Sequence, residues 1–167
     1  MSFRIDFHHL ALVLAVLPLC ACDMVEEHPV LTERVGKGAV PWLTNFDVGL
    51  ARAREEGKPI LLEFTGSDWC VWCQQLDREV FTQPQFQDYA KGRFILVEID
   101  FPHTETLPEE VFNDRDALRQ KFKVEEYPTV VVLNPGGEEL GRFSYQKGGV
   151  ASFVESVEKL IKPLNFR

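Results

Sequence analysis

Two cysteines that stand two residues apart, Cys70 and Cys73, are the residues of this chain best suited to redox chemistry. They follow the apolar run 60–64, which predicts a strand that delivers them to the first turn of a helix. At a helix start, unpaired backbone N–H groups and the helix dipole favour a thiolate and lower its pKa from about 8.5. The spacing therefore predicts a pair that opens to two thiols and closes to a disulfide.

The two cysteines are predicted to have different roles. Cys70, at the helix start, is the expected nucleophile, and Cys73, one turn later, would attack the mixed disulfide and release the reduced product. The alternatives are a structural disulfide and half of a metal site, but a lone pair cannot complete a tetrahedral zinc site. Gln74 stands where a haem-attachment motif needs histidine. We therefore expect no metal and no cofactor other than the Cys70–Cys73 disulfide itself.

The start of the chain has the pattern of an export signal. A weakly basic stretch precedes the apolar residues 10–19, a run too short to span a bilayer, which takes about 20 apolar residues. The Leu-Cys-Ala-Cys that ends at Cys22 resembles a bacterial lipobox, which implies removal of residues 1–21 and a lipid on Cys22. The alternative is an ordinary signal peptide cut near Ala21, although the leucine three positions before the lipobox cysteine fits that cleavage site poorly.

The rest of the chain reads as one domain after a linker. Residues 22–41 show no sustained helical or strand period, and we expect them to be a linker from the lipid anchor. Residues 42–167 are enough for one well-buried core, with no internal repeat and no second domain. If Cys22 is acylated and Cys20 removed, the mature chain keeps one thiol pair. We expect a monomer.

Charge limits the class of partner. The formal net charge is −8 at pH 7, which argues against nucleic acid and against broad adhesion to anionic lipids. The densest acidic patch is formed by Glu105, Glu109 and Glu110. For this patch we favour a solvated face over a docking site.

Helical and strand periods alternate from Trp42 onward. Apolar spacing predicts helices from Phe46, from the cysteines, from a cap at Asn113 and over 150–161, with a break near Pro84 in the second. Strands are predicted at 60–65, 94–99, 129–133 and 139–145, the last two joined by the Asn-Pro-Gly-Gly turn at 134–137. This order predicts an α/β fold with a central mixed four-stranded sheet flanked by helices.

These motifs together resemble the thioredoxin superfamily over about residues 42–163. The resemblance rests on Trp-Cys-x-x-Cys at a helix start, on Tyr127-Pro128-Thr129 before a strand, and on the 134–137 hairpin turn. Residues 63–70, Glu-Phe-Thr-Gly-Ser-Asp-Trp-Cys, are more narrowly similar to exported bacterial thioredoxin-like proteins. Those proteins are related to the C-terminal domain of disulfide-interchange reductases. The resemblance implies a thioredoxin-like fold for the domain.

The resemblance also implies a substrate-binding surface around the thiols. Pro128 would be a cis-proline that presents the backbone of Tyr127 and Thr129 to an extended peptide, the alternative being a trans proline at an edge strand. Trp69 and Trp72 flank the cysteines and are candidates for the same surface, although burial is the alternative for both and is favoured for Trp69.

For two further polar residues, the sequence gives weaker indications of a functional role. Glu63 interrupts an apolar strand, where thioredoxins hold a buried aspartate that serves the proton transfers of the thiols. Glu63 is one residue farther from the first cysteine than that aspartate, so a solvated strand glutamate is the alternative. His103 is expected to be a surface-loop residue.

The predicted function is a thiol–disulfide oxidoreductase that reduces disulfides in exported proteins. The insert Val71-Trp72 adds no cation to stabilise a thiolate, so strong oxidising character lacks support. An oxidising exterior supplies no soluble reductant, so we expect a membrane electron donor. The alternatives are a disulfide oxidase or isomerase, and a non-catalytic adaptor that binds an exported partner. We expect a periplasmic, lipid-anchored protein, and Asp23 resembles an inner-membrane retention signal.

Overall fold

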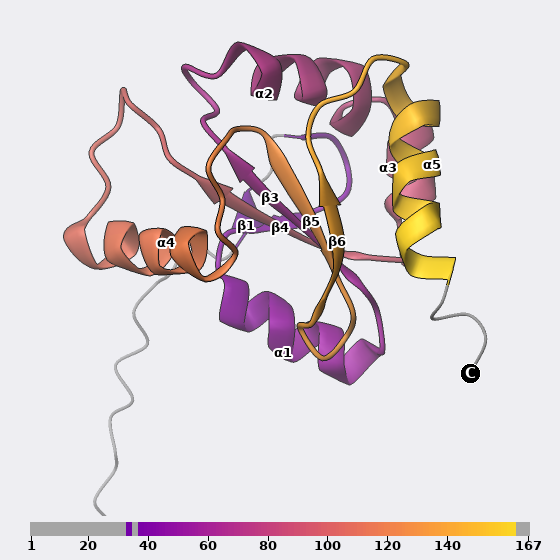
Figure 1. The fold of residues 1–167 in the computed structure, drawn as a ribbon, viewed down its shortest axis with the longest axis horizontal. Helices are drawn as coiled ribbons and strands as arrows, with labels where there is room; N and C mark the ends of the chain where they lie inside the picture. Colours follow the sequence, from indigo (N-terminus) through magenta and orange to yellow (C-terminus); the bar gives the residue numbers. More distant parts are fainter. Residues whose placement is uncertain (1–32, 35–36, 163–167) are drawn as a thin grey trace, which may run out of the picture.

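The computed structural model describes residues 33–34 and 37–162, so the predicted export signal and Cys22 lie outside the described residues. The described strands are β1 (Glu33–Arg34), β2 (Trp42–Leu43), β3 (Ile60–Thr65), β4 (Ile95–Asp100), β5 (Thr129–Leu133) and β6 (Glu139–Phe143). The helices are α1 (Phe46–Glu56), α2 (Val71–Leu76), the π-helical turn η1 (Asp77–Phe81), α3 (Pro84–Ala90), α4 (Glu109–Lys121) and α5 (Gly149–Ile161). Figure 1 shows these helices around one central sheet.

The strands form one mixed sheet in the order β1-β2-β4-β3-β5-β6. The central strand β3 pairs in parallel with β4 and antiparallel with β5, and β6 closes the hairpin. The predicted α/β architecture is confirmed, but the prediction of four strands is too low for the residues that the structure describes. The additional strands β1 and β2 have two residues each. Strands that short show no alternation of apolar and polar residues from which they could be predicted.

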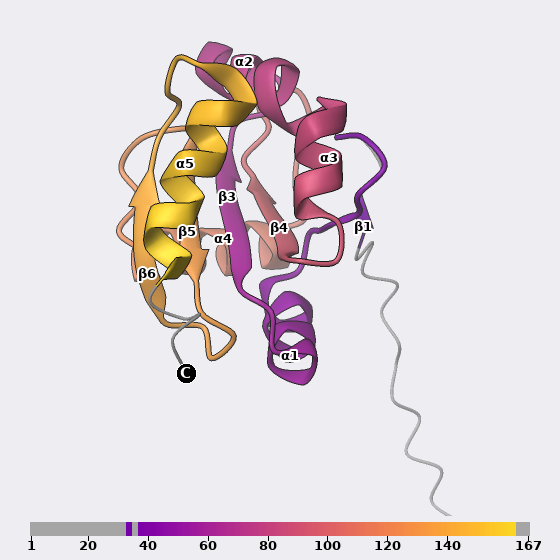
Figure 2. The same ribbon diagram turned by 90° about the vertical axis from the view of Figure 1, so that its right-hand side faces the viewer.

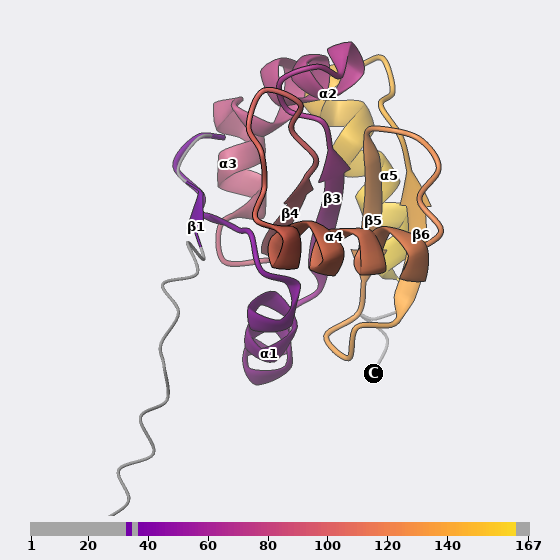
Figure 3. The same ribbon diagram turned by 90° about the vertical axis from the view of Figure 1, so that its left-hand side faces the viewer.

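Both faces of the sheet are covered by helices. Alternate residues of β3 point to opposite faces, so Leu61 contacts the layer of α2, α3 and α5, while Leu62 contacts the side of α1. Figure 2 shows α3 and α5 in front of the sheet, and Figure 3 shows α4 crossing in front of the opposite face. Both sides of β3 are therefore buried, and this explains why its sequence is almost continuously apolar.

Part of the segment predicted as a linker, 22–41, belongs to the folded domain. Strand β1 pairs with β2, and Lys37 is buried in the interior of the domain. The amide of Gln87 on α3 fixes this N-terminal strap, residues 37–40, by donating to the Lys37 carbonyl at 2.8 Å and accepting from the Val40 N–H at 2.6 Å. The folded domain therefore begins before Trp42, and a single buried lysine gives no periodic pattern that would indicate this.

Between the cysteines and β5, one prediction about the helices is confirmed and another is wrong. The predicted break near Pro84 is present, because α2 runs into η1 and Pro84 then starts α3. The predicted cap at Asn113 is wrong, since α4 begins one turn earlier at Glu109 and Asn113 lies inside it. Pro108 precedes the helix with no capping side chain, so the sequence lacks the usual polar N-cap there.

Gly49 sets how closely α1 lies on β4. A Cβ atom at this position would come within 2.5 Å of a Val97 methyl. We therefore expect Gly49→Ala to lower the free energy of unfolding by about 1 to 3 kcal/mol, although alanine favours a helix. Chemical denaturation measures the change, with the exposed neighbour Val48→Ala as control, expected to stay within about 0.5 kcal/mol of the parent. An unchanged midpoint for Gly49→Ala would mean that α1 does not pack as closely as described.

Candidate active site

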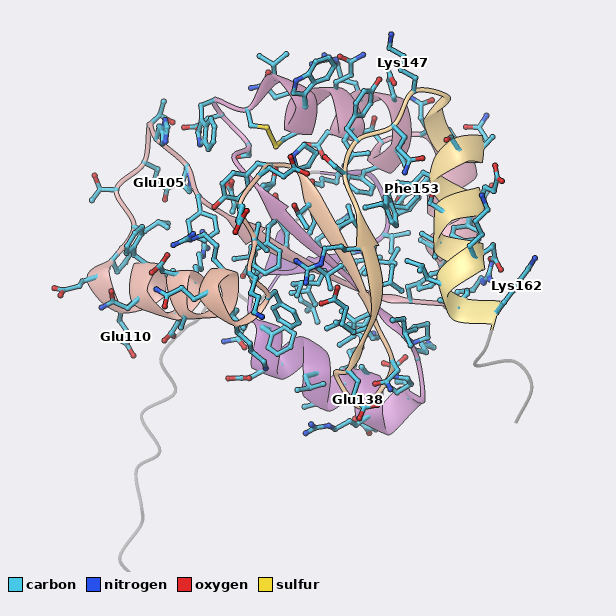
Figure 4. All side chains as sticks on the ribbon, in the orientation of Figure 1. Glu105, Glu110, Glu138, Lys147, Phe153 and Lys162 are labelled. Carbon is cyan, nitrogen blue, oxygen red and sulfur yellow. A yellow bond between two sulfur atoms is a disulfide. The ribbon has the colours of Figure 1, made fainter. Side chains whose placement is uncertain are left out.

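Cys70 and Cys73 form a disulfide at the start of α2, with their Cα atoms 5.2 Å apart. Figure 4 shows the bond between the two sulfur atoms under the N-terminal end of α2. Cys70 is the N-cap residue of the helix, and its Sγ accepts a hydrogen bond from the Cys73 N–H at 3.2 Å. The same N–H and the helix dipole would stabilise negative charge on Cys70 when the disulfide is open.

The two sulfurs differ in access. Cys70 keeps 6% of its surface exposed, whereas Cys73 has 0%. An external thiol or disulfide can therefore approach Cys70, while Cys73 can react only with a group already attached to its partner. This asymmetry matches the predicted order of attack, in which Cys70 acts first and Cys73 resolves the mixed disulfide.

Trp69 lies across the turn that leads from β3 to the cysteines. A Cβ atom at Gly66 would come within 2.3 Å of the indole, so only glycine allows this approach. The indole Nε1 donates to the Phe101 carbonyl at 2.7 Å, and its ring stacks on His103 at 4.5 Å. Trp69 nevertheless stays 39% exposed, so the favoured expectation that it is buried was wrong. His103 is exposed, as predicted, but is held against Trp69.

Trp72 lies on the other side of the cysteines. Trp72 is 53% exposed, and its ring stacks on that of Tyr145 with centroids 5.3 Å apart. The Tyr145 hydroxyl donates to Glu79 at 2.8 Å, which fixes the tyrosine under the indole. Both tryptophans therefore present aromatic surface beside Cys70.

The segment before β5 completes the surroundings of the disulfide. The Tyr127–Pro128 peptide bond is cis, the form that the resemblance implies. The Tyr127 ring meets the Trp69 ring edge to face, with centroids 5.7 Å apart. Thr129, in contrast, is buried, and its hydroxyl donates to the Glu126 carbonyl at 2.8 Å. The Thr129 side chain thus cannot contact a substrate, and only its backbone remains a candidate.

Glu63 is fully buried, which excludes the alternative of a solvated strand glutamate. It pairs across the β3–β4 ladder with Glu98, so two carboxylates lie side by side on the face covered by α2 and η1. The Lys37 ammonium forms an ion pair with Glu63 and lies 3.0 Å from Asp77 and 3.3 Å from Glu98. One buried cation therefore holds three carboxylates, a group we call the Lys37 cluster.

The Lys37 cluster has three carboxylates and one ammonium, and this excess of acidic groups affects how Glu63 titrates. Burial raises the pKa of the Glu63 carboxyl to about 8, against the lowering effect of the Lys37 ammonium and with a further rise from Asp77 and Glu98. Burial alone would lower the pKa of Lys37, but the three carboxylates outweigh it and raise that pKa, so the ammonium stays charged. Glu63 can therefore gain and lose a proton near neutral pH.

The Lys37 cluster is connected to the resolving cysteine through one helical turn. The Asp77 N–H donates to the carbonyl of Cys73, and the Asp77 carboxylate contacts Lys37. The sequence analysis named Glu63 but missed Lys37, Asp77 and Glu98. Glu98 could have been found, since it interrupts its apolar strand just as Glu63 does, whereas Lys37 and Asp77 carry no such pattern.

Within 33–34 and 37–162, no group of His, Cys, Asp or Glu side chains is arranged to hold a metal ion. In the same ranges, no helix is long and apolar enough to cross a membrane.

Comparisons with known sequences place this geometry in a family. A thioredoxin-like family model matches residues 41–135. The disulfide bond reductase DsbH of Chlamydia pneumoniae is 30% identical over 152 residues, which cover 90% of this chain and 91% of that protein. The thiol:disulfide interchange protein DsbD 1 of Pseudomonas aeruginosa is 32% identical over 94 residues, which cover 56% of this chain but only 14% of that much longer protein.

Solved structures agree with the sequence matches. A DsbH oxidoreductase structure superposes with a TM-score of 0.70 at 32% identity and covers 77% of this chain and 90% of that one. A thioredoxin from Thermus thermophilus, 21% identical with a TM-score of 0.54 and a coverage of 70% and 84%, supports the fold alone. With the Cys70–Cys73 disulfide at the head of α2, the chain belongs to the thioredoxin-like family and is a thiol–disulfide oxidoreductase.

Proposed function

We propose that this oxidoreductase works as a reductase of disulfides in exported proteins. The observation that carries the proposal is the one-sided access to the disulfide, because Cys70 keeps 6% of its surface exposed beside Trp69 and Tyr127, whereas Cys73 keeps none. The DsbH relative bears the name of a disulfide bond reductase. No described lysine, arginine or histidine lies between the cysteines, so nothing there stabilises the thiolate beyond the helix start.

The reaction follows from this access. The Cys70 thiolate attacks one sulfur of the substrate disulfide, forms a Cys70–substrate bond and expels the other substrate sulfur as a thiolate, which takes a proton. The Cys73 thiol then loses its proton and attacks Cys70 Sγ, which releases the second substrate thiol and closes the Cys70–Cys73 bond. The substrate gains two electrons, and the protein loses two. A donor must return these electrons before the next cycle.

The proposed cellular setting rests on the sequence. A lipid on Cys22 would hold the domain on the periplasmic side of the bacterial envelope, and Asp23 favours the inner membrane. A membrane electron donor would then reduce Cys70–Cys73, because the periplasm holds no soluble reducing pool. We further propose that the protein is a monomer that acts on exported proteins.

Glu63 is proposed as a proton relay that exchanges a proton with Cys73 when the mixed disulfide is resolved. Burial raises its pKa to about 8, so both its ionised and its protonated form are accessible close to neutral pH. The charged groups that face it are Lys37 from the strap, Glu98 from β4 and Asp77 from η1. Lys37 favours the ionised form of Glu63 and so keeps the pKa of Glu63 from rising further.

The first prediction concerns the two cysteines. Cys73→Ser should trap a covalent complex between Cys70 and a disulfide-containing substrate, because the resolving thiol is missing. Cys70→Ser should form no such complex, since the Cys73 sulfur is enclosed. Non-reducing electrophoresis and mass spectrometry of the purified full-length variants with oxidised insulin-type substrates measure the outcome. Equal trapping by both variants would contradict the assigned order.

The second prediction concerns the direction of electron flow. We expect the Cys70–Cys73 pair to equilibrate with a dithiol buffer near the potential of thioredoxin, about −270 mV. Tryptophan fluorescence reads the equilibrium, because Trp69 and Trp72 adjoin the two sulfurs. A value near −120 mV would make the protein an oxidase. The absence of any reversible transition would leave a non-catalytic adaptor.

The third prediction concerns the Lys37 cluster. The single-turnover rate of disulfide reduction should show an inflection near pH 8, which Glu63→Gln removes. Lys37→Met should move the inflection to higher pH, because the ammonium no longer stabilises the ionised carboxyl. The exposed Lys91→Met, which removes the same charge elsewhere, should leave the profile unchanged. A profile that all three variants share with the parent would exclude a proton role for Glu63.

A further inference from the structure

A groove opens directly beside the active site, on the side away from Trp72. Its volume is about 730 Å³, and its apolar lining includes Trp69, Phe101, Pro102, Leu107, Phe112 and Tyr127. Trp69 precedes Cys70, and Tyr127 precedes the cis Pro128, so one wall of the groove adjoins the reactive sulfur. The opposite wall is the loop 101–107 and the first turns of α4.

Polar contacts from the active-site turn position the loop that forms one wall of the groove. The Asp68 carboxylate, in the turn before the cysteines, accepts hydrogen bonds from the His103 N–H at 3.0 Å and from both the N–H and the hydroxyl of Thr104. The bond from the Thr104 hydroxyl, with the two backbone bonds, lowers the pKa of Asp68 to about 2, so this tie persists at working pH. Trp69 adds its bond to the Phe101 carbonyl. The loop is thus positioned by the active-site turn itself.

Phe112 on α4 is an exposed aromatic residue of the groove lining. Its ring is 48% exposed, although it meets Phe101 edge to face at 6.5 Å. Helix α4 buries none of its residues, so Phe112 does not anchor the helix to the sheet. An exposed aromatic ring at the rim of an apolar groove is typical of a surface that becomes covered when a partner binds.

The rim of the groove is acidic. Glu105 and Glu109 line it, and Glu110 follows in the first turn of α4. Figure 4 shows Glu105 on the loop before α4 and Glu110 at the start of that helix. Among the described lining residues there is no lysine or arginine, and the two carboxylates of the first turn outweigh the partial positive charge of the helix end. The groove therefore attracts a cation and repels an anion.

We propose that this groove binds an extended segment of the substrate protein in which an apolar, preferably aromatic, side chain and a lysine or arginine lie near the disulfide cysteine. The apolar side chain would fill the space between Trp69 and Phe112, and the cation would pair with Glu105 and Glu109. The inference deepens the proposed reductase function by naming its substrate class, and it rests on that function. The same acidic residues were expected from sequence to be a solvated face.

A second copy of this chain is a poorer occupant. Two copies that meet through this groove would bring their acidic rims together, on a chain whose net charge is already −8. A basic, partly unfolded substrate instead gains both the apolar contact and the charge complementarity, which mainly raises its rate of association.

The test uses peptides that carry one cysteine in a disulfide with 2-mercaptoethanol. Three peptides differ only near the cysteine and hold phenylalanine with lysine, phenylalanine with glutamate, or alanine with lysine. The pre-reduced full-length protein should reduce the phenylalanine–lysine peptide about tenfold faster than the phenylalanine–glutamate peptide at low salt, and the difference should shrink at high salt. It should also reduce the alanine–lysine peptide several-fold more slowly. Chromatography of the released peptide thiol gives the rates.

Variants assign the selectivity to the groove. Glu105→Gln with Glu109→Gln should remove the preference for lysine over glutamate, while Phe112→Ala should remove the preference for phenylalanine over alanine. The control Glu55→Gln with Asp88→Asn removes the same charge from exposed positions outside the groove lining and should keep both preferences. All variants should reduce 2-hydroxyethyl disulfide at the parental rate, because this molecule is too small to contact the rim while it reacts with Cys70.

The outcomes separate the two proposals. If 2-hydroxyethyl disulfide is reduced but the three peptides react alike, or if the control variant loses the preferences, the docking proposal is wrong and the reductase function stands. If the pre-reduced protein reduces no disulfide at all, the proposed function itself fails. If Phe112→Ala instead dissolves a dimer detected by sedimentation, the groove is a contact between copies, which also overturns the docking proposal.

Discussion

The buried ammonium of Lys37 is the interaction on which the layer beneath the active site depends. It lies between the sheet and α2–η1, where it holds carboxylates from β3, β4 and η1. Removing one partner from such a buried group typically costs about 3 to 5 kcal/mol, because the remaining charges are left uncompensated. The N-terminal strap and the helical layer that carries the cysteines are therefore held together through Lys37. A segment predicted as linker from the sequence thus becomes part of the layer beneath the active-site disulfide.

The position of the Lys37 cluster links charge to the state of the thiols. Opening the disulfide places a thiolate in the same layer as Glu63, where up to three carboxylates surround one cation. The added negative charge of the thiolate is favoured only if Glu63 takes up a proton, which its raised pKa allows. The burial of Glu63 therefore fits a role in proton exchange. A carboxylate that served only folding would be more stable in its ionised form at a position exposed to solvent.

The sequence predicted those parts of the molecule that depend on local pattern. The Cys70–Cys73 pair, the apolar strand before it and the break at Pro84 are each encoded within a few residues, and each is present. Lys37 could not be predicted, because its partners lie far from it in sequence and a lone lysine in a polar stretch has no period. The groove was missed for a similar reason. It exists only because Asp68 and Trp69 hold the distant loop 101–107 in place.

Trp69 lies between the disulfide and the proposed docking groove. One edge of its indole is fixed to the Phe101 carbonyl and one face is stacked on His103, so its remaining surface is held rigidly between Cys70 and the groove. A rigid aromatic wall loses little side-chain entropy when a substrate binds, and this favours specific contacts with an otherwise flexible chain. The sulfur chemistry is common to any dithiol of suitable pKa, whereas the groove and its acidic rim are particular to this arrangement. Selectivity among disulfides would then come from how fast each substrate is brought to Cys70, not from how fast its bond is broken.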